Sequence, residues 1–269
     1  MNKKDGPPNS LGQLPFPTSL AFEPIQLCNA TCFCCPYSWL RNDDAYRGKK
    51  MSRDQIELLL DDFGGIRDRH KYNGFLGISP YRFSDPLVCK DLGFILEKAD
   101  KYRLNVAITT NGIGLDGETL ALLDRFRHLF SKISISLIGA TTDDVKDLMG
   151  IKFPKVLKNI ENIADNWPNL KKITRVSMRR VTHSDEELYT ISKLKQMFEL
   201  KGINIKFIKD NWITNRVNNS EFVKGEKPVS LPRKSQTTSH FIYGCGWSDN
   251  LLNRMEVMVD GDVVLCCDD

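Results

Sequence analysis

The stretch KISISLI, residues 132–138, decides the fold class of this chain. Its isoleucines alternate with small polar residues, which is typical of a β-strand with one buried face. Working outward, helical patterns separate it from two further apolar runs, LNVAITT (104–110) before it and ITRVSM (173–178) after it. Short apolar strands that alternate with amphipathic helices predict a parallel sheet with helices packed outside it.

Three more runs extend this series. They are SLAFEPIQL (19–27), GFLGIS (74–79) and INIKFI (203–208). Six strand–helix units are too few for a closed eight-stranded barrel. The sequence therefore predicts an α/β fold, a partial (β/α)6 barrel of parallel strands with helices outside.

The chain changes character after about residue 208. A polar segment with little periodicity follows, and then RMEVMVDGDVVLCC (254–267), which predicts two short strands around the turn Asp260-Gly261. We expect a small C-terminal β-hairpin extension. The predicted organisation is a flexible leader (1–17), a barrel (18–208), a connector or lid loop (209–244) and the hairpin extension (245–269).

Composition narrows the class of protein. The 269 residues are 41% hydrophobic and 27% charged, with a net charge of +4. No apolar run approaches the roughly 20 residues of a membrane span, and no basic stripe with interleaved aromatic residues predicts nucleic-acid binding. We expect a cytoplasmic protein without membrane or nucleic-acid partners. Thiols stay reduced in that compartment, so clustered cysteines favour metal binding or chemistry over disulfides.

Polar features follow several predicted strands. They are the cysteine-rich stretch CNATCFCCPYSW (28–39), Ser84-Asp85-Pro86, Thr110-Asn111-Gly112 and Ser136. Ligands of parallel α/β folds bind at the carboxyl ends of the strands. These four features, which lie far apart in sequence, are predicted to converge on one mouth.

The cysteine-rich stretch has the spacing C-x3-C-x2-C at Cys28, Cys32 and Cys35. Three thiolates on one loop suit three corners of a [4Fe–4S] cluster and leave the fourth iron open for chemistry. The alternative is a structural zinc site made of Cys28, Cys32, either Cys34 or Cys35, and a distant fourth ligand. The three-cysteine spacing directly after a first strand favours the cluster.

CNATCFCC, between this strand and the β/α series, resembles the radical S-adenosylmethionine (SAM) enzymes. The resemblance implies that Cys28, Cys32 and Cys35 bind a [4Fe–4S] cluster and that SAM chelates the open iron. It also implies reductive cleavage of SAM to a 5′-deoxyadenosyl radical, which abstracts hydrogen from a substrate. Cys34 stands where the family usually has an aromatic residue, so Phe33 or Tyr37 would take that role.

Later segments match the family in order, and the resemblance gives them roles in binding SAM. SDPL, which contains Ser84 and Asp85, stands in the place of a Gly-Glu motif, and Asp85 would accept a hydrogen bond from the methionyl ammonium. A simple turn and helix start is the alternative for this segment. In TTNG, Thr110, Asn111 and Gly112 would bring backbone close to the nucleoside. Ser136 would contact the ribose.

The family often holds the SAM carboxylate with an Arg beyond this Ser. Here Met149 and Gly150 occupy that neighbourhood. Lys152, Arg175 and Arg179 are the alternatives, and Arg175 on the next strand is preferred.

Cysteines also flank the C-terminal hairpin. Cys245 precedes it, and Cys266 and Cys267 follow. This arrangement resembles the start of a SPASM or twitch extension, which implies an auxiliary Fe–S cluster with Cys245 and Cys266 as ligands. Such extensions carry further cysteines downstream. The extension is therefore expected to be truncated, and the alternatives are an incomplete site or a site that recruits another ligand. The alternative is a hairpin with buried thiols; Cys89 is likewise expected to be a core residue.

The resemblance implies an enzyme that acts on a peptide or protein, or on a small sugar-like molecule. It also implies a reductant protein of the flavodoxin or ferredoxin type. No residue beyond these binding roles is assigned to catalysis. The rival hypothesis is a non-catalytic interaction module that binds zinc or an Fe–S cluster, and metal content separates the two.

Overall fold

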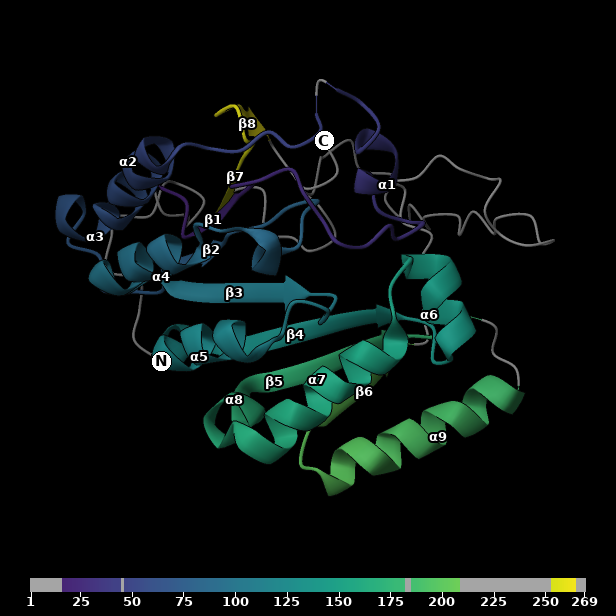
Figure 1. Cartoon of the computed structure of the whole chain (residues 1–269). Helices are drawn as coiled ribbons and strands as arrows, with labels where there is room; N and C mark the ends of the chain where they lie inside the picture. The colour runs from purple at the N-terminus through teal and green to yellow at the C-terminus, as the bar shows by residue number, and fades with distance from the viewer. Residues whose placement is uncertain (1–15, 45, 182–184, 209–252, 265–269) are drawn as a thin grey trace, which may run out of the picture.

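The computed structural model describes residues 16–44, 46–181, 185–208 and 253–264 (Figure 1). Its eight strands form one sheet in the order β6-β5-β4-β3-β2-β1-β7-β8, and every pair is parallel except β7 with β8. This confirms the predicted series of six parallel strands. The strands are β1 (Ser19–Phe22), β2 (Gly77–Ser79), β3 (Asn105–Thr110), β4 (Phe130–Ile138), β5 (Thr174–Arg179), β6 (Asn204–Ile208), β7 (Arg254–Val257) and β8 (Val263–Val264).

Helices connect successive strands. None of those in the described ranges is long and apolar enough to cross a membrane. They are α1 (Tyr37–Leu40), α2 (Arg53–Gly64), α3 (Ile66–Arg69), α4 (Leu92–Lys101), α5 (Gly117–Arg125), α6 (Thr142–Met149), α7 (Phe153–Asn166), α8 (Pro168–Ile173) and α9 (Asp185–Leu200), with the 3-10 turns η1 (Pro86–Val88) and η2 (Arg127–Leu129).

Side-chain caps begin several helices where the sequence predicts them. Ser52 accepts the backbone N–H of Gln55 at 3.2 Å, and the Gln55 side chain accepts the Ser52 N–H at 2.8 Å, a capping box for α2. Asp116 and Thr141 cap α5 and α6. The apolar pattern of residues 87–101 predicts one helix that begins at Leu87. This prediction is wrong at its start, because η1 ends at Val88 and α4 begins only at Leu92.

The central strand β4 has two chemically different faces. Ile133, Ile135 and Leu137 are buried in the core, whereas Ser134 and Ser136 between them are partly exposed. The buried set packs with helix residues such as Val156 and Leu170 in one hydrophobic cluster. We call the side of these helices the outer face of the sheet and the side of the serines the inner face.

The C-terminal hairpin is confirmed, with β7 and β8 antiparallel and Gly261 in the turn at φ +96°. Strand β7 also pairs in parallel with β1, with Leu20 opposite Met255. The sequence pattern does not predict this pairing. The hairpin therefore continues the barrel sheet past its first strand. The two ends of the described chain meet at this edge.

The carboxyl ends of the strands share one side of the molecule. In Figure 1 the arrowheads of β3 and β4 point toward the side on which α1 and α6 lie. The loop after β1, which leads into α1 and holds the cysteines, is on that side. This placement is the one predicted for a binding mouth.

Candidate functional site

The loop that carries the cysteines is fastened to the end of α6. We call residues 28–35 the cluster loop. Its Thr31 N–H donates to the Met149 carbonyl at 2.8 Å, and its Phe33 N–H donates to the Leu148 carbonyl at 2.9 Å. The otherwise unpaired carbonyls at the carboxyl end of a helix thus receive partners from the loop. These bonds fix the loop backbone independently of its thiols.

Gly150 makes this close approach sterically allowed. It ends α6 in the left-handed region at φ +66°, and a Cβ added there would lie 2.2 Å from Thr31 Oγ1. The family resemblance implies an Arg near this position, where the chain has Met149 and Gly150. The structure gives it a different use, as the surface against which the cluster loop packs.

The thiols of the cluster loop lie close together in partly buried positions. Burial, with smaller contributions from the nearby Asp85 and Cys35, raises the pKa of Cys28 to about 12. Burial, together with the neighbouring thiols Cys34 and Cys35, raises the pKa of Cys32. A bound metal must therefore displace protons from these groups.

Single-metal geometry is absent from the part of the chain that the structure describes. No group of three or more His, Cys, Asp or Glu side chains there could hold one ion. Zinc needs its sulfur ligands about 2.3 Å from a single point. A cluster binds each thiolate through a separate iron, so the thiols need not converge.

Asp85 joins the ends of β2 and β3. Its side chain is only 3% exposed, and it accepts hydrogen bonds from Thr110 Oγ1 at 2.8 Å, Asn111 N at 2.9 Å and Leu87 N at 3.0 Å. Burial raises the pKa of Asp85, and these three donors oppose that rise. The carboxylate thus organises the turn after β3, and its expected contact to an ammonium group stays a prediction.

Asn111 extends this connection to the cluster loop. Its Nδ2 donates to Asn29 Oδ1 at 2.6 Å and lies 3.9 Å from Cys28 Sγ. The structure therefore brings together Cys28, Asp85 and Asn111, which come from three different strand ends.

Gly112 makes the turn after β3 tight. Its φ is +85°, and an added Cβ would lie 2.9 Å from Val156 Cγ1. Its N–H donates to Thr110 Oγ1 at 3.1 Å, and its carbonyl accepts from Asn159 Nδ2 at 2.8 Å. A glycine is required here by backbone conformation and by space.

Ser136 and Arg175, which are both predicted to contact SAM, lie at opposite ends of their strands. Ser136 lies near the carboxyl end of β4 on the inner face, opposite Ser177 of β5. Arg175 lies near the start of β5, and its Nη1 donates to the carbonyls of Lys172 and Thr174 at 2.9 and 2.8 Å. The structure thus brings Ser136 toward the mouth and does not bring Arg175 there.

Ser84 Oγ is buried and has no hydrogen-bond partner among the residues that the structure describes. A buried hydroxyl without a partner is costly, which marks a place for a polar group of a ligand. It adjoins Asp85 on the same loop. Three thiols on one loop beside an orphaned hydroxyl fit a cluster with a polar, amino-acid-bearing cofactor.

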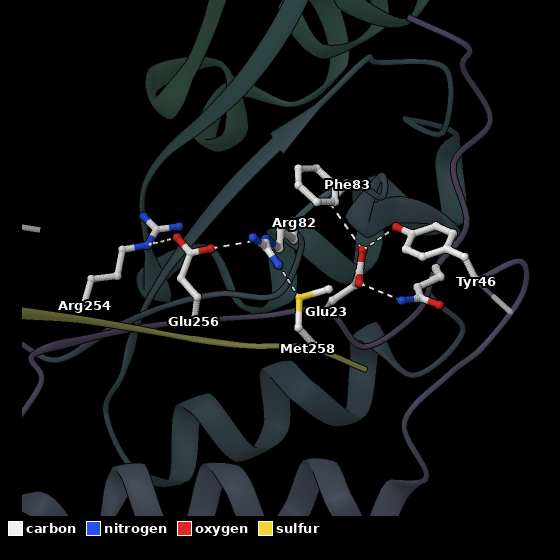
Figure 2. Close-up of polar contacts among 8 residues, drawn as sticks. Glu23, Tyr46, Arg82, Phe83, Arg254, Glu256 and Met258 are labelled. Atoms are coloured by element: carbon white, nitrogen blue, oxygen red, sulfur yellow. Dashed lines mark hydrogen bonds and ion pairs between the residues drawn. The ribbon is translucent and has the colours of Figure 1, made fainter. Parts of the chain in front are cut away.

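A buried carboxylate supports the loop after β2 from behind (Figure 2). Glu23 is fully buried, and its Oε1 accepts from Tyr46 Oη at 2.8 Å and from Phe83 N at 3.4 Å. Gln26 Nε2 donates to its Oε2 at 3.1 Å. Burial raises the pKa of Glu23 and also that of Tyr46. Glu23 therefore holds segments on both sides of the cluster loop to the loop that carries Ser84.

Arg82 connects the same loop to the C-terminal strand (Figure 2). Its Nε lies 3.4 Å from Glu256 Oε2, and both side chains are about 5% exposed or less. Arg254 Nε lies 2.9 Å from Glu256 Oε1, and Arg82 also contacts the Met258 sulfur and covers the Phe83 ring at 4.7 Å. Strand β7 is thus part of the scaffold of the site.

Sequence reasoning misses these supporting residues. The only signal is Glu23 itself, a charged residue inside the apolar run SLAFEPIQL, with a proline after it. Arg82 and Glu256 are 174 positions apart and have no local signature.

Some predictions lie outside the described residues, namely Cys245 and Cys266 as auxiliary ligands, the lid loop 209–244 and the Ser184 helix cap. Cys89 is 8% exposed and belongs to the hydrophobic core, which confirms its expected structural role.

Comparisons with known proteins identify the family and the fold of this chain. A model of the Radical SAM superfamily matches residues 22–190. No curated protein matches this chain.

Solved structures share the fold. The chain is similar to Streptococcus suis SuiB bound to the precursor peptide SuiA, at 17% identity and TM-score 0.51 over 95% of this chain and 60% of SuiB. It is similar to BtrN in complex with AdoMet and 2-DOIA, at 16% identity and TM-score 0.50 over 94% of this chain and 74% of BtrN. The chain thus spans about 60% of the length of SuiB. Because the matched family region covers more than half of the sequence and contains the cluster loop, the chain belongs to the Radical SAM superfamily.

Proposed function

We propose that this protein cleaves SAM reductively and abstracts a hydrogen atom from a peptide, a protein or a small sugar-like molecule. The single observation that supports this most strongly is the junction of Cys28, Asp85 and Asn111 at one mouth. When bound, the [4Fe–4S] cluster and SAM supply a 5′-deoxyadenosyl radical.

The residues of this chain hold and orient the cofactors. Cys28, Cys32 and Cys35 are the cluster ligands. Ser84 and Asp85 face the amino-acid part of SAM, and the turn Thr110-Asn111-Gly112 approaches its nucleoside. Ser136 contacts the ribose. These assignments rest on their order at strand ends and on the orphaned Ser84 hydroxyl.

The position of Arg175 changes the proposed contact to the SAM carboxylate. Arg175 donates to two backbone carbonyls near the start of β5. Lys152 and Arg179 thus remain as alternatives for the SAM carboxylate, and Lys152 immediately precedes α7.

The substrate proposal draws on the neighbours. SuiB is described bound to a precursor peptide and BtrN bound to 2-DOIA. We propose that this chain likewise takes a peptide or a small molecule, with electrons supplied by a flavodoxin- or ferredoxin-type protein.

The deciding experiment measures 5′-deoxyadenosine from protein that is purified without oxygen, reconstituted with iron and sulfide, reduced and given SAM. We expect product from the wild type and none from Cys32→Ala. Cys89→Ala is the matched control, because Cys89 lies in the core away from the cluster loop, and it should retain product. Bound zinc in place of iron, with no product, would instead support the non-catalytic module.

An auxiliary cluster is a separate proposal, supported by the spacing of Cys245 and Cys266 around the hairpin. Iron and sulfide content of the reconstituted protein tests it. A Cys245→Ala variant should bind less iron than wild type while it retains the spectrum of the cluster-loop site. Equal iron in both proteins would remove the auxiliary cluster from the proposal.

A further inference from the structure

The side chain of Asn111 is buried at the mouth, and each end of its amide has a defined partner. It is only 7% exposed. Its Oδ1 accepts the backbone N–H of Ile113 at 3.0 Å, and its Nδ2 donates to Asn29 Oδ1 at 2.6 Å. The same Nδ2 donates to Cys28 Sγ at 3.9 Å. One amide therefore connects the turn after β3 to the thiol of a proposed cluster ligand.

The orientation of this amide follows from its partners. A backbone N–H can only donate, so the Asn111 atom that faces Ile113 must be the carbonyl oxygen. The NH2 group must then face the cluster loop, where its two hydrogens match two acceptors. A thiolate bound to iron carries negative charge, and a charged acceptor draws a donor closer.

The turn after β3 holds Asn111 in place from the other side. Asp85 accepts the Asn111 N–H at 2.9 Å. Asn159 Nδ2, from α7, donates to the carbonyls of Gly112 and Ile113 at 2.8 and 3.3 Å. The cluster loop is fixed separately by its two backbone hydrogen bonds to the end of α6. The fold thus sets the position of the NH2 group relative to the sulfur.

A donor at a cluster ligand changes the free energy of the reduced cluster. The added electron increases the negative charge on the iron and its sulfurs, and a hydrogen bond to sulfur stabilises that charge. The reduction potentials of Fe–S clusters therefore depend on hydrogen bonds to the sulfurs and on exposure to solvent. Because Asn111 is buried, this hydrogen bond lies in a medium of low dielectric constant, where it is stronger than in water.

We infer that Asn111 is a positioning residue that raises the reduction potential of the cluster through an N–H···S hydrogen bond to Cys28. This inference rests on the proposed function, since the cluster is the group that receives the electron needed to cleave SAM. Asn111 also belongs to the turn that is proposed to approach the nucleoside of SAM. One side chain thus couples this turn to the ease with which the cluster is reduced.

The test measures the reduction potential of the cluster in the reconstituted full chain, by redox titration followed by electron paramagnetic resonance. The relevant signal is the one that Cys32→Ala removes. Asn111→Ser retains an oxygen that can accept the Ile113 N–H, as serine does in similar turns, but its hydroxyl is too short to reach Cys28. We expect its equilibrium constant for one-electron reduction to fall by a factor of about three to ten, which lowers the potential by about 30 to 60 mV.

Asn29→Ala is the matched control. It removes the other acceptor of the same NH2 group and leaves the donor to Cys28 in place. Its equilibrium constant for reduction should therefore stay within about twofold of wild type, or about 20 mV. Asn111→Ala is a second variant without the donor, and its potential should fall as in Asn111→Ser.

A measurement on the wild type decides the case in which neither Asn111 variant assembles a cluster. The protein is produced with asparagine that carries ¹⁵N at the side-chain amide, and the reduced cluster is studied by pulsed electron paramagnetic resonance. We expect a hyperfine coupling to an amide nitrogen in the wild type, and Asn29→Ala should retain it.

Three results would overturn the inference. They are an equal potential in the wild type and both Asn111 variants, an equal fall in Asn29→Ala, and no coupling to an amide nitrogen in the wild type. The proposed function fails separately. Absence of 5′-deoxyadenosine with a potential that depends on Asn111 would remove only the function, whereas product with an unchanged potential would remove only the inference. A wild type that assembles no cluster would contradict both.

Discussion

At the scale of single residues, Asp85 connects the β2 and β3 ends of the mouth. Its two oxygens receive one hydroxyl and two backbone donors. An Asp side chain is one methylene shorter than the Glu of the related motif, so it stays close to its own backbone. This reach suits contact with Thr110 and Asn111.

Asp85→Asn should loosen this junction. An amide places an NH2 group against one of the donors, which leaves a buried donor unsatisfied at about 1–3 kcal/mol. We expect a lower melting temperature and at least tenfold weaker SAM binding by calorimetry. Asp147→Asn, on the exposed side of α6, is the matched control and should change neither. An unchanged melting temperature in Asp85→Asn would contradict the junction role.

Gly150→Ala should displace the cluster loop. The left-handed backbone costs a residue with Cβ about 1–2 kcal/mol, and the new methyl group would collide with Thr31. We expect lower iron content after reconstitution and a lower melting temperature. Gly117→Ala is the control, because no atom lies within 4 Å of an added Cβ there. Full iron content in Gly150→Ala would show that the loop tolerates the shift.

The buried Glu23 carboxyl makes a prediction about pH. Its pKa is raised by burial, so the folded state holds this proton more tightly than the unfolded state. The protonated Glu23 carboxyl contributes fully to the stability of the folded state below the pKa of the unfolded state, about 4.3. This contribution is lost as the pH rises through the pKa of Glu23 in the folded state. Glu23→Gln does not titrate. Relative to wild type, the free energy of unfolding of the variant should therefore rise as the pH increases above about 4.3.

Urea unfolding of both proteins across this pH range measures the difference. A difference that stays flat with pH would mean that Glu23 titrates alike in both states.

At the scale of elements, β7 supports a loop to which it is not adjacent in sequence. Arg82 and Glu256 form a buried ion pair between the loop after β2 and β7. Removal of one partner of a buried pair costs about 3–5 kcal/mol, because a charge is left without compensation. The Ser84 and Asp85 segment should therefore lose order when this pair is broken.

Glu256→Ala should destabilise the protein by this amount and weaken SAM binding. Arg82→Met/Glu256→Met removes both charges and should recover part of the stability. Denaturant unfolding and SAM calorimetry measure the two effects. Equal stability of the single and double variants would contradict coupling between the two side chains. Lys195→Met, which removes an exposed cation that lies 3.7 Å from Glu199, serves as the exposed-pair control.

At the scale of the whole molecule, the sheet pairs the first strand, β1, with β7 near the other end of the described chain. Thr18 N donates to the Asn253 carbonyl at 2.8 Å across 235 positions of sequence. Contacts of such separation form late, because a long loop must close first. β7 also covers an edge of β1 that would otherwise present unpaired backbone groups.

Met255→Pro should expose that edge. Proline removes a backbone donor from a strand that pairs with β1 on one side and β8 on the other. We expect a lower melting temperature and concentration-dependent association by size-exclusion chromatography. Met255→Val preserves the backbone and should stay monodisperse to the same extent as wild type. Matching elution of both variants at every concentration would show that β7 is dispensable at the edge.

Much of the fold follows from local patterns. The alternation in β4, the caps at Ser52, Asp116 and Thr141, and the turn at Gly261 are each set by residues close in sequence. The turn at Gly112 can also be predicted from the sequence, because Asn-Gly after a strand favours a tight turn. The helix start after Asp85 does not follow from the local pattern, because the segment first forms a 3-10 turn that the Asp85 side chain caps.

The sequence by itself determined the parallel β/α series and the placement of the cysteines, Asp85 and Asn111 at strand ends, because periodicity and turn chemistry are local properties. Only the tertiary structure decided that β7 joins β1, that α6 holds the cluster loop, that Arg82 pairs with Glu256 and that Arg175 stays away from the mouth. These outcomes depend on packing and charge compensation between segments far apart in the chain. No local pattern encodes which distant partner a buried charge will find.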